Sequence, residues 1–268
     1  MIKYFDLRKK NYADRKKRND LFEFDIYNWK STPYSCLKAR VYIELSTIFA
    51  FLTQFTSLTA NHISLIYCIC GLVAGTFLAS NIDSLMITGL IIFFLKGSVD
   101  WTDGLVARIK NQTSPTGHIL DTWGSHIGSV SLISSLGIYC YNNFFDEIYL
   151  ILTIIILFLK NIDFKLFAYH QLFYELLNNE IEFNKNLDKN KNEISKKENL
   201  AVLIVKNFMD DRARTVDMIC FLILLEIIYD FHFFSKIILT LYLLKAIILF
   251  IGIFYAYYYK GRIDKNIQ

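Results

Sequence analysis

Six apolar segments, each close to the length that crosses the hydrocarbon core of a bilayer, constrain this chain more than any other feature. A transmembrane helix needs about 20 predominantly apolar residues. The first segment, HISLIYCICGLVAGTFLAS, carries no formal charge. Segments of this kind predict an all-α, multi-pass membrane protein with six transmembrane helices. The six segments cover residues 62–80, 84–103, 118–141, 148–170, 215–234 and 237–259.

Composition supports this class and excludes several others. Hydrophobic residues make up 54% of the chain and charged residues 20%, which is more apolar than an average soluble domain. Two prolines, 11 glycines and five scattered cysteines exclude disordered, collagen-like and disulfide-scaffold classes. Cys68 and Cys70 lie two positions apart, so on a helix they face different directions and are read as buried apolar residues rather than metal ligands.

The residues before the first span are expected to remain on the membrane surface. The first twenty residues hold eight Lys or Arg against three Asp, and no apolar core of a signal peptide follows them. A nucleic-acid-binding arm is one interpretation of this stretch, but a basic segment facing anionic cytoplasmic lipids fits so apolar a chain better, so no nucleic acid is expected. Residues 38–57 alternate polar and apolar at helical spacing, which predicts an interfacial amphipathic helix.

Loop charges predict the orientation. Loops 81–83 and 142–147 contain no Lys or Arg, whereas basic residues gather at the N-terminus, in the 175–214 stretch and in the tail. The positive-inside rule therefore places both termini in the cytoplasm, as an even number of spans requires. The expected organisation is a basic cytoplasmic segment (1–35), a membrane domain (36–260) and a cytoplasmic tail (261–268). The membrane domain includes a cytoplasmic loop (175–214) with a short helix around Leu200–Phe208.

Three carboxylates near the cytoplasmic junction of the second and third spans carry the chemistry: Asp100, Asp103 and Asp121. Asp100 and Asp103 share a helix face, and Asp121 lies one turn into the next span, where it can face them across a helical hairpin. Converging carboxylates repel one another unless cations lie between them, and oxygen ligands favour Mg²⁺, Mn²⁺ or Ca²⁺. Such a cluster suits the binding and displacement of a diphosphate.

The residues between these acids favour a nucleotide. Gly104 and Ala107 remove side chains from one face, so a nucleotide could approach the backbone. Arg108 supplies a planar donor fork for phosphate oxygens.

At this point the sequence resembles a known family, the CDP-alcohol phosphotransferases. The family signature is D-x2-D-G-x2-A-R-x8-G-x3-D-x3-D. The TANHIS segment (Thr59–Ser64) also resembles the family's Pro-Asn-x-x-Thr motif, with Ala60 in place of proline. Seven of the eight fixed positions of the signature are present at the correct spacing: Asp100, Asp103, Gly104, Ala107, Arg108, Gly117 and Asp121.

The resemblance implies a reaction class in phospholipid biosynthesis. Such enzymes transfer a phospho-alcohol group from a CDP-linked donor, such as CDP-diacylglycerol, to the hydroxyl of a polyol, a sugar phosphate or a lipid. CMP is released, and a divalent metal, Mg²⁺ or Mn²⁺, is required. Homodimers are common in the family, and the residues themselves give no signal for or against one. By matching position, Asp100, Asp103 and Asp121 are metal ligands, and the CDP site is lined by Gly104, Ala107, Arg108 and Gly117.

The eighth position departs from the family, because Ser125 stands where the final Asp, the general base, is expected. A serine cannot replace a carboxylate as a base at neutral pH. Three interpretations stay open. His118 takes over, since positions 118, 121 and 125 lie within about 60° of one another on one helix face. Alternatively, Asp121 or metal-bound water serves as the base. In the third interpretation, the chain has lost catalysis and binds only nucleotide or lipid.

Basic residues in the spans offer further hypotheses. Lys96, one turn before Asp100, either neutralises the carboxylates, meets a phosphate or has a structural role. Lys160, Lys165 and Arg214 suggest an anionic acceptor opposite the metal site. An ion or solute transporter is a weaker alternative, because the acids cluster near the cytoplasmic face rather than at the midplane.

Overall fold

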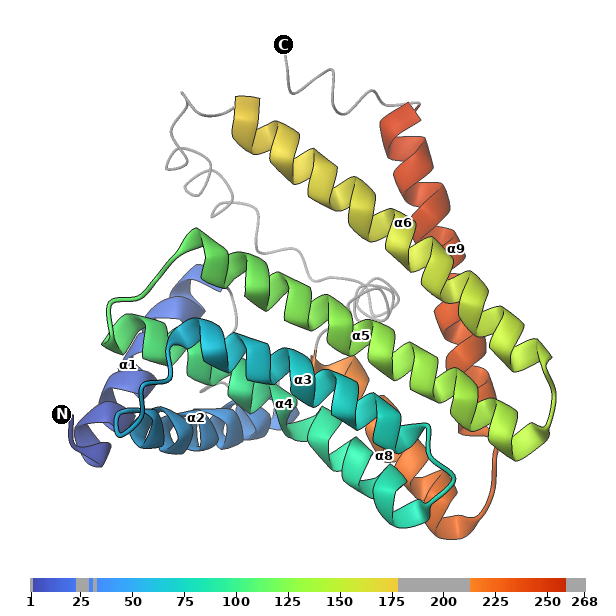
Figure 1. Ribbon diagram of the computed structural model, residues 1–268, viewed down its shortest axis with the longest axis horizontal. Coiled ribbons are helices and arrows are strands. Elements are labelled where there is room, and N and C mark those ends of the chain that lie inside the picture. Colours follow the sequence, from blue (N-terminus) through green and yellow to red (C-terminus); the bar gives the residue numbers. More distant parts are fainter. Residues whose placement is uncertain (1, 23–28, 31–32, 178–212, 259–268) are drawn as a thin grey trace.

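The computed structural model describes residues 2–22, 29–30, 33–177 and 213–258, and all structural statements concern these residues. Within them the chain is helical and contains no strand, which confirms the all-α prediction. Figure 1 shows α3, α4, α5 and α8 packed together, with α6 and α9 extending away from them side by side. The helices are α1 (Tyr4–Phe22), α2 (Pro33–Thr53), α3 (Ala60–Leu78), α4 (Asp83–Ile109), α5 (Pro115–Phe144), α6 (Ile148–Leu177), α8 (Ala213–Tyr229) and α9 (Phe234–Tyr258).

Three of these helices are long and apolar enough to cross a membrane: α3, α4 and the Phe234–Tyr255 part of α9. The Ile148–Ile162 part of α6 is apolar but shorter. Each of the six predicted spans coincides with a helix, apart from a few residues at the ends of some spans. The membrane class is therefore supported, whereas the count of six spans stays a prediction. The helix expected around Leu200–Phe208 lies outside the described residues.

Small residues bring α3 and α5 into close contact. A Cβ atom on Gly71 would lie 3.1 Å from the Cα of Gly128, and one on Gly75 would lie 2.0 Å from the Oγ of Ser131. Helices in membranes approach closely where glycine and serine form the interface, because dispersion contacts there replace the missing hydrophobic drive. Gly89 plays the same part between α4 and α3, since its Cβ would lie 2.6 Å from the carbonyl oxygen of Ala74.

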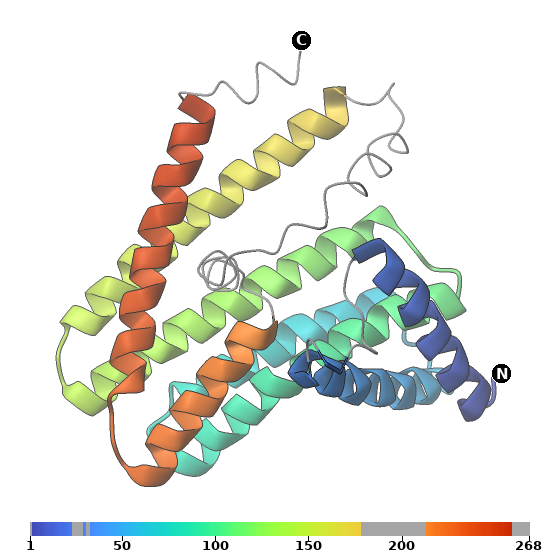
Figure 2. The same ribbon diagram turned by 180° about the vertical axis from the view of Figure 1, so that it is seen from behind.

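Two apolar clusters hold the ends of the bundle. One joins α3, α4, α5, α6, α8 and α9, with Leu78, Leu136 and Ile223 fully buried. The other joins α1, α2, α3 and α4 through Leu7 and Leu105, which are also fully buried. Leu105 lies within the Asp100–Arg108 stretch of α4, so the second cluster packs directly against that stretch. Figure 2 shows the same arrangement from behind, with α2 lying against α4.

The N-terminal basic segment contains a helix that the sequence analysis did not predict. Helix α1 packs on α2 through buried Asn11, whose amide donates hydrogen bonds to the hydroxyl oxygens of Ser46 (3.2 Å) and Thr47 (3.0 Å). Tertiary contact therefore stabilises a helix in a stretch that the sequence predicts only as a basic segment facing anionic lipids.

Helix α2 begins at Pro33, five residues before the predicted amphipathic helix, and ends at Thr53. Its small and polar residues, such as Ser46 and Thr47, are buried against neighbouring helices, while Leu37 and Leu52 are each 55% exposed. An outward apolar side is the arrangement that an interfacial helix needs, although its position in a membrane stays a prediction.

A buried ion pair joins α2 to α8 across 179 positions of sequence. The Lys38 ammonium donates to the Asp217 carboxylate, which also accepts from the hydroxyl of Tyr34. Both charged side chains are less than a tenth exposed. Buried charges cost several kcal/mol each to desolvate, so the pair is stable only while both partners are present.

We expect Asp217→Leu alone to lower the free energy of unfolding by ~3–5 kcal/mol, because it leaves the Lys38 ammonium buried without its carboxylate. The double variant Lys38→Met, Asp217→Leu should recover most of this loss. Unfolding in detergent, followed by circular dichroism, measures both. A double variant as unstable as the sum of the single variants would contradict the pairing.

A second prediction concerns pH and the contact between α1 and α2. The Arg8 guanidinium donates to the Glu44 carboxylate (2.8 Å) and the Tyr12 hydroxyl does the same (2.8 Å), so the pKa of Glu44 lies below its ordinary value of 4.5. A carboxyl group that is more acidic when folded stabilises the fold above its unfolded pKa, and the stabilisation is lost as the pH falls through the lowered value. We therefore expect α1 to loosen from α2 below about pH 4.5.

The distance distribution between two spin labels, one on each helix, should broaden on acidification in the parent. In Glu44→Gln it should already be broad at neutral pH and change little. A parent distribution that does not change with pH would show that apolar contacts alone hold α1.

Candidate functional site

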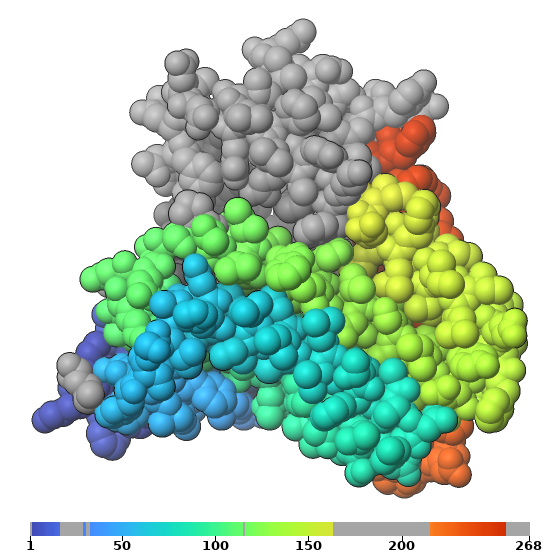
Figure 3. All heavy atoms as spheres, in the orientation of Figure 1, coloured from blue at the N-terminus to red at the C-terminus, as the bar shows by residue number. Residues whose placement is uncertain are grey.

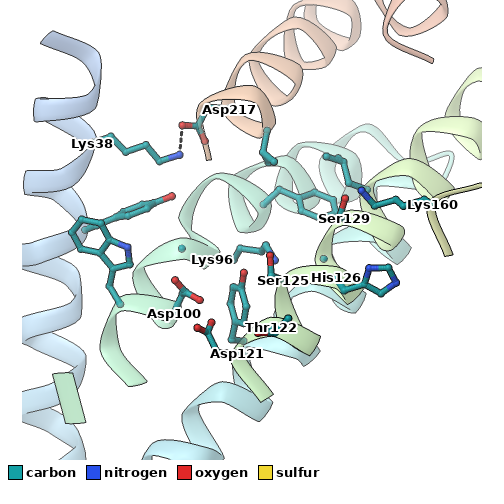
Figure 4. A pocket seen from close by; sticks show the side chains of 18 of the residues that line it. Lys38, Lys96, Asp100, Asp121, Thr122, Ser125, His126, Ser129, Lys160 and Asp217 are labelled. Carbon is teal, nitrogen blue, oxygen red and sulfur yellow. Dashed lines mark hydrogen bonds and ion pairs between the residues drawn. The ribbon is translucent and has the colours of Figure 1, made fainter. Parts of the chain in front are cut away.

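A cavity of about 610 Å³ lies among α2, α3, α4, α5, α6, α8 and α9. It is here called the large cavity in contrast to a cavity of about 200 Å³ beside it. Figure 4 shows Asp100 and Asp121 grouped at one side and Lys38 with Asp217 at the other, with Lys96 and Ser125 between them. Acidic and basic side chains thus face one space from several helices. Its charged lining residues are Lys38, Lys96, Asp100, Asp121, Lys160 and Asp217.

Asp100 of α4 and Asp121 of α5 approach each other closely enough for their carboxyl groups to interact directly. Two carboxylates in such contact repel each other unless a proton or a cation lies between them. Their oxygens are the donors that a hard divalent cation prefers. The pair therefore fits the metal that the motif implies.

Asp103 lies beside this pair and makes a hydrogen bond of its own. Its carboxylate accepts from the hydroxyl of Ser64 on α3 at 2.6 Å, and the residue is only 8% exposed. It lines a second, small cavity of about 200 Å³ that Asp121 also lines. Within the described part of the chain, no group of three His, Cys, Asp or Glu side chains is close enough to hold a metal ion. The structure thus brings Asp100 and Asp121 together and leaves Asp103 beside them.

The small cavity collects all four residues expected at the nucleotide: Gly104, Ala107, Arg108 and Gly117. A Cβ on Gly104 would lie 3.3 Å from the guanidinium of Arg108, and one on Gly117 would lie 3.3 Å from the amide oxygen of Asn61. Glycine therefore leaves the room that a nucleotide would need at these two positions. Helix α5 is capped here by Ser114, whose hydroxyl accepts from the amide of Gly117 at 3.1 Å.

Helix α1 extends to the edge of this cavity. The Nε atom of Arg108 lies 3.4 Å from the carboxylate of Asp14, and both side chains are about one-fifth to one-quarter exposed. The arginine that the motif assigns to phosphate is therefore positioned by a residue outside the motif. Sequence reasoning missed Asp14 because its helix was not expected.

His118 and Ser125 line different cavities. His118 is exposed on the small cavity, whereas Ser125 faces the large one. Seven residues along a helix correspond to about 10 Å, so a shared helix face does not bring the two side chains to one reacting atom. Asp121 lies between them and lines both cavities.

Several lining residues were not singled out by the sequence. Tyr67 of α3 interacts with Ser125 through its hydroxyl and lies under the Lys96 ammonium, 4.1 Å from the ring centroid. Lys38 comes from α2, and His126 lines the large cavity although it does not share a helix face with Ser125. Tyrosines are so common here that no sequence signal marks Tyr67. Lys160 lines the cavity as well, while the side chains of Lys165 and Arg214 lie outside the described residues.

Comparison with known proteins identifies a family that part of the chain matches. Residues 57–175 match the family model for CDP-alcohol phosphatidyltransferase. The match covers α3, α4, α5 and most of α6, and so includes Asp100 and Asp103 on α4 and Asp121 on α5. No curated protein shows a significant match to the chain.

Proposed function

We propose that this chain, whose residues 57–175 match the CDP-alcohol phosphatidyltransferase family model, transfers a phospho-alcohol group from a CDP-linked donor to an acceptor hydroxyl. The donor that best suits a helical membrane domain is a lipid such as CDP-diacylglycerol, which would make the reaction a step of phospholipid biosynthesis. The acceptor is a polyol, a sugar phosphate or a lipid.

One observation carries this proposal: Asp121 lines both the small cavity with the nucleotide residues and the large cavity with Asp100. A diphosphate that joins a nucleotide in the small cavity to a group in the large one would cross the Asp100–Asp121 pair. The transferred phosphorus would then lie where a second substrate can reach it from the large cavity.

The described residues divide the work of such a transfer. The backbone beside Gly104 and Ala107 offers space to the nucleotide, and the Arg108 guanidinium binds phosphate oxygens in bidentate fashion. A divalent cation, Mg²⁺ or Mn²⁺, held by Asp100 and Asp121 with Asp103 beside them, would offset the charge of the diphosphate. The acceptor oxygen bonds to the phosphorus, the bond to CMP breaks, and the acceptor proton passes to a base.

The placement favours Asp121 as that base over His118. Asp121 faces the large cavity, where the acceptor would lie, whereas His118 lines the small cavity. Ser125 also faces the acceptor space, and a hydroxyl there can orient a hydroxyl substrate without taking its proton.

A second candidate function rests on Ser125 itself. If the missing carboxylate is essential, the chain is a catalytically inactive relative that binds nucleotide or lipid. The two functions differ in one measurable property, the metal-dependent release of CMP.

The setting proposed for this activity is a six-span integral membrane domain with its site and both termini in the cytoplasm. The charge asymmetry of the loops supports this orientation. Homodimerisation, common in the family, belongs to the same proposal.

The test is CMP release by purified protein given CDP-diacylglycerol, Mg²⁺ or Mn²⁺, and a panel of polyol, sugar phosphate and lipid acceptors. We expect metal-dependent turnover that falls roughly 10²–10³-fold in Asp100→Asn, because the developing negative charge on the diphosphate is then less well stabilised. His118→Ala should keep most of the turnover, and a loss of about 100-fold or more would make His118 the base. A parent inactive with every acceptor, and with CDP-choline-type donors as well, would favour the inactive relative.

Metal binding gives a separate prediction. Titration with Mn²⁺, followed by electron paramagnetic resonance, should show binding that Asp100→Asn or Asp121→Asn each weakens by at least about tenfold, since changing even an outer partner of a metal ligand often costs that much. Asp83→Asn, at the opposite end of α4, is the matched control and should leave the affinity unchanged. Equal binding in all variants would place the metal elsewhere.

A further inference from the structure

We propose that the Lys96 ammonium is a binding point for a phosphate group of the substrate, and that serine at position 125 keeps this ammonium available. The proposal rests on the transferase function proposed above and names a substrate class for the large cavity. Either the acceptor or the donor could bring the phosphate, and the experiment below separates these sources.

The placement of Lys96 depends on the α3–α5 crossing. Its side chain reaches over the backbone of Gly128, where a Cβ atom would lie 2.0 Å from the Nζ atom. Gly71 on the facing helix leaves room too, since its Cβ would lie 3.8 Å from the same nitrogen. Glycine at position 128 therefore admits the lysine to the large cavity, which it lines.

In the described part of the chain, the Lys96 ammonium contacts the ring of Tyr67, 4.1 Å from its centroid. A cation–π contact contributes modestly, whereas an ammonium inside a membrane domain is costly and marks a functional site by default. Tyr67 thus positions the lysine without neutralising its charge, and an anionic ligand would neutralise it.

Position 125 decides whether that charge is available. Ser125 and Gly128 are three residues apart on α5 and so share a face, and Ser125 and Lys96 both meet Tyr67. Figure 4 shows Lys96 and Ser125 directed into the same part of the cavity. An aspartate at position 125 would bring a carboxylate into this part of the cavity, where it would pair with the ammonium. The serine hydroxyl carries no charge and leaves the ammonium to the ligand.

The surrounding charges favour an anion in the same part of the cavity. Lys160 adds a second cationic side chain to the lining of the cavity, and His126 adds a hydrogen-bonding ring. A phosphate group is the anion common to CDP-linked donors and to phosphorylated acceptors, and lysine binds phosphate as a point charge.

The alternative is that Lys96 serves Asp100 as a counter-ion, since the two lie one helical turn apart. In that case the lysine would affect metal binding and stability but not the affinity for a phosphate compound. Binding measured without turnover separates these roles.

The experiment is isothermal titration of the full chain in nanodiscs with glycerol 3-phosphate, inorganic phosphate and CDP, with glycerol as the uncharged control. We expect Lys96→Met to weaken phosphate binding roughly 10–100-fold, as the loss of a charged hydrogen-bond partner does. Gly128→Ala should weaken it too, because the new methyl group displaces the ammonium while the lysine remains. Ser125→Asp should weaken it by pairing with Lys96, whereas Ser125→Ala should not.

Lys236→Met is the matched control, because Lys236 also lies over an aromatic ring, that of Phe144 at 3.5 Å, but away from the large cavity. Weakened binding of glycerol 3-phosphate in Lys96→Met assigns the phosphate to the acceptor, and weakened binding of CDP assigns it to the donor. Unchanged binding of every probe in folded Lys96→Met overturns the proposal, as does a parent that binds no phosphate probe.

A protein that binds these probes through Lys96 but releases no CMP would support the phosphate site and reject the transferase function. If the parent releases CMP while Lys96→Met leaves the affinity for every probe unchanged, the transferase function is supported and the phosphate site is rejected. The two proposals therefore fail separately.

Discussion

The close crossing of α3 and α5 is the contact on which the rest of the site depends. Gly71 and Gly128 let the two backbones meet, and this places Tyr67 of α3 beside Ser125 of α5. Asp121, one turn before Ser125, is thereby turned toward Asp100 of α4. Larger side chains at the crossing would separate the helices, and the carboxylates would no longer face one space. In a membrane this contact depends on close packing, since lipid supplies no hydrophobic driving force for helices to associate.

The large cavity is lined in part by elements that lie far from the motif in sequence. The Lys38–Asp217 ion pair joins α2 to α8. Figure 3 shows the surfaces of α3, α4 and α5, which carry the motif region, lying against one another on the face toward the viewer. Arg108, at the other cavity, is held by Asp14 of α1. The helices outside residues 57–175 thus contribute charged groups to both cavities, and the family match does not include them.

Much of the site follows from the spacing of seven residues. Because Gly104, Ala107 and Arg108 occupy adjacent turns of one helix, their grouping at the small cavity needs only helical periodicity. The helical class and most helix positions follow from the length of the apolar segments. Helix α1 was missed, since its stability comes from buried Asn11 and Leu7 rather than from its own sequence pattern. The hydrogen bond that Asp103 accepts from Ser64 of α3 joins residues 39 positions apart, and spacing alone does not reveal it.

The sequence by itself determined the residue types, their order along α4 and α5, and the resemblance to a family that the match to residues 57–175 bears out. Only the tertiary structure decided which cavity each residue enters. It separated His118 from Ser125, joined Lys96 to Tyr67 and brought Lys38 to the site from the N-terminal side. The physical reason is that periodicity fixes the face of a helix on which a side chain lies. What that face meets depends on helix crossings, and these are set by contacts between residues far apart in the chain.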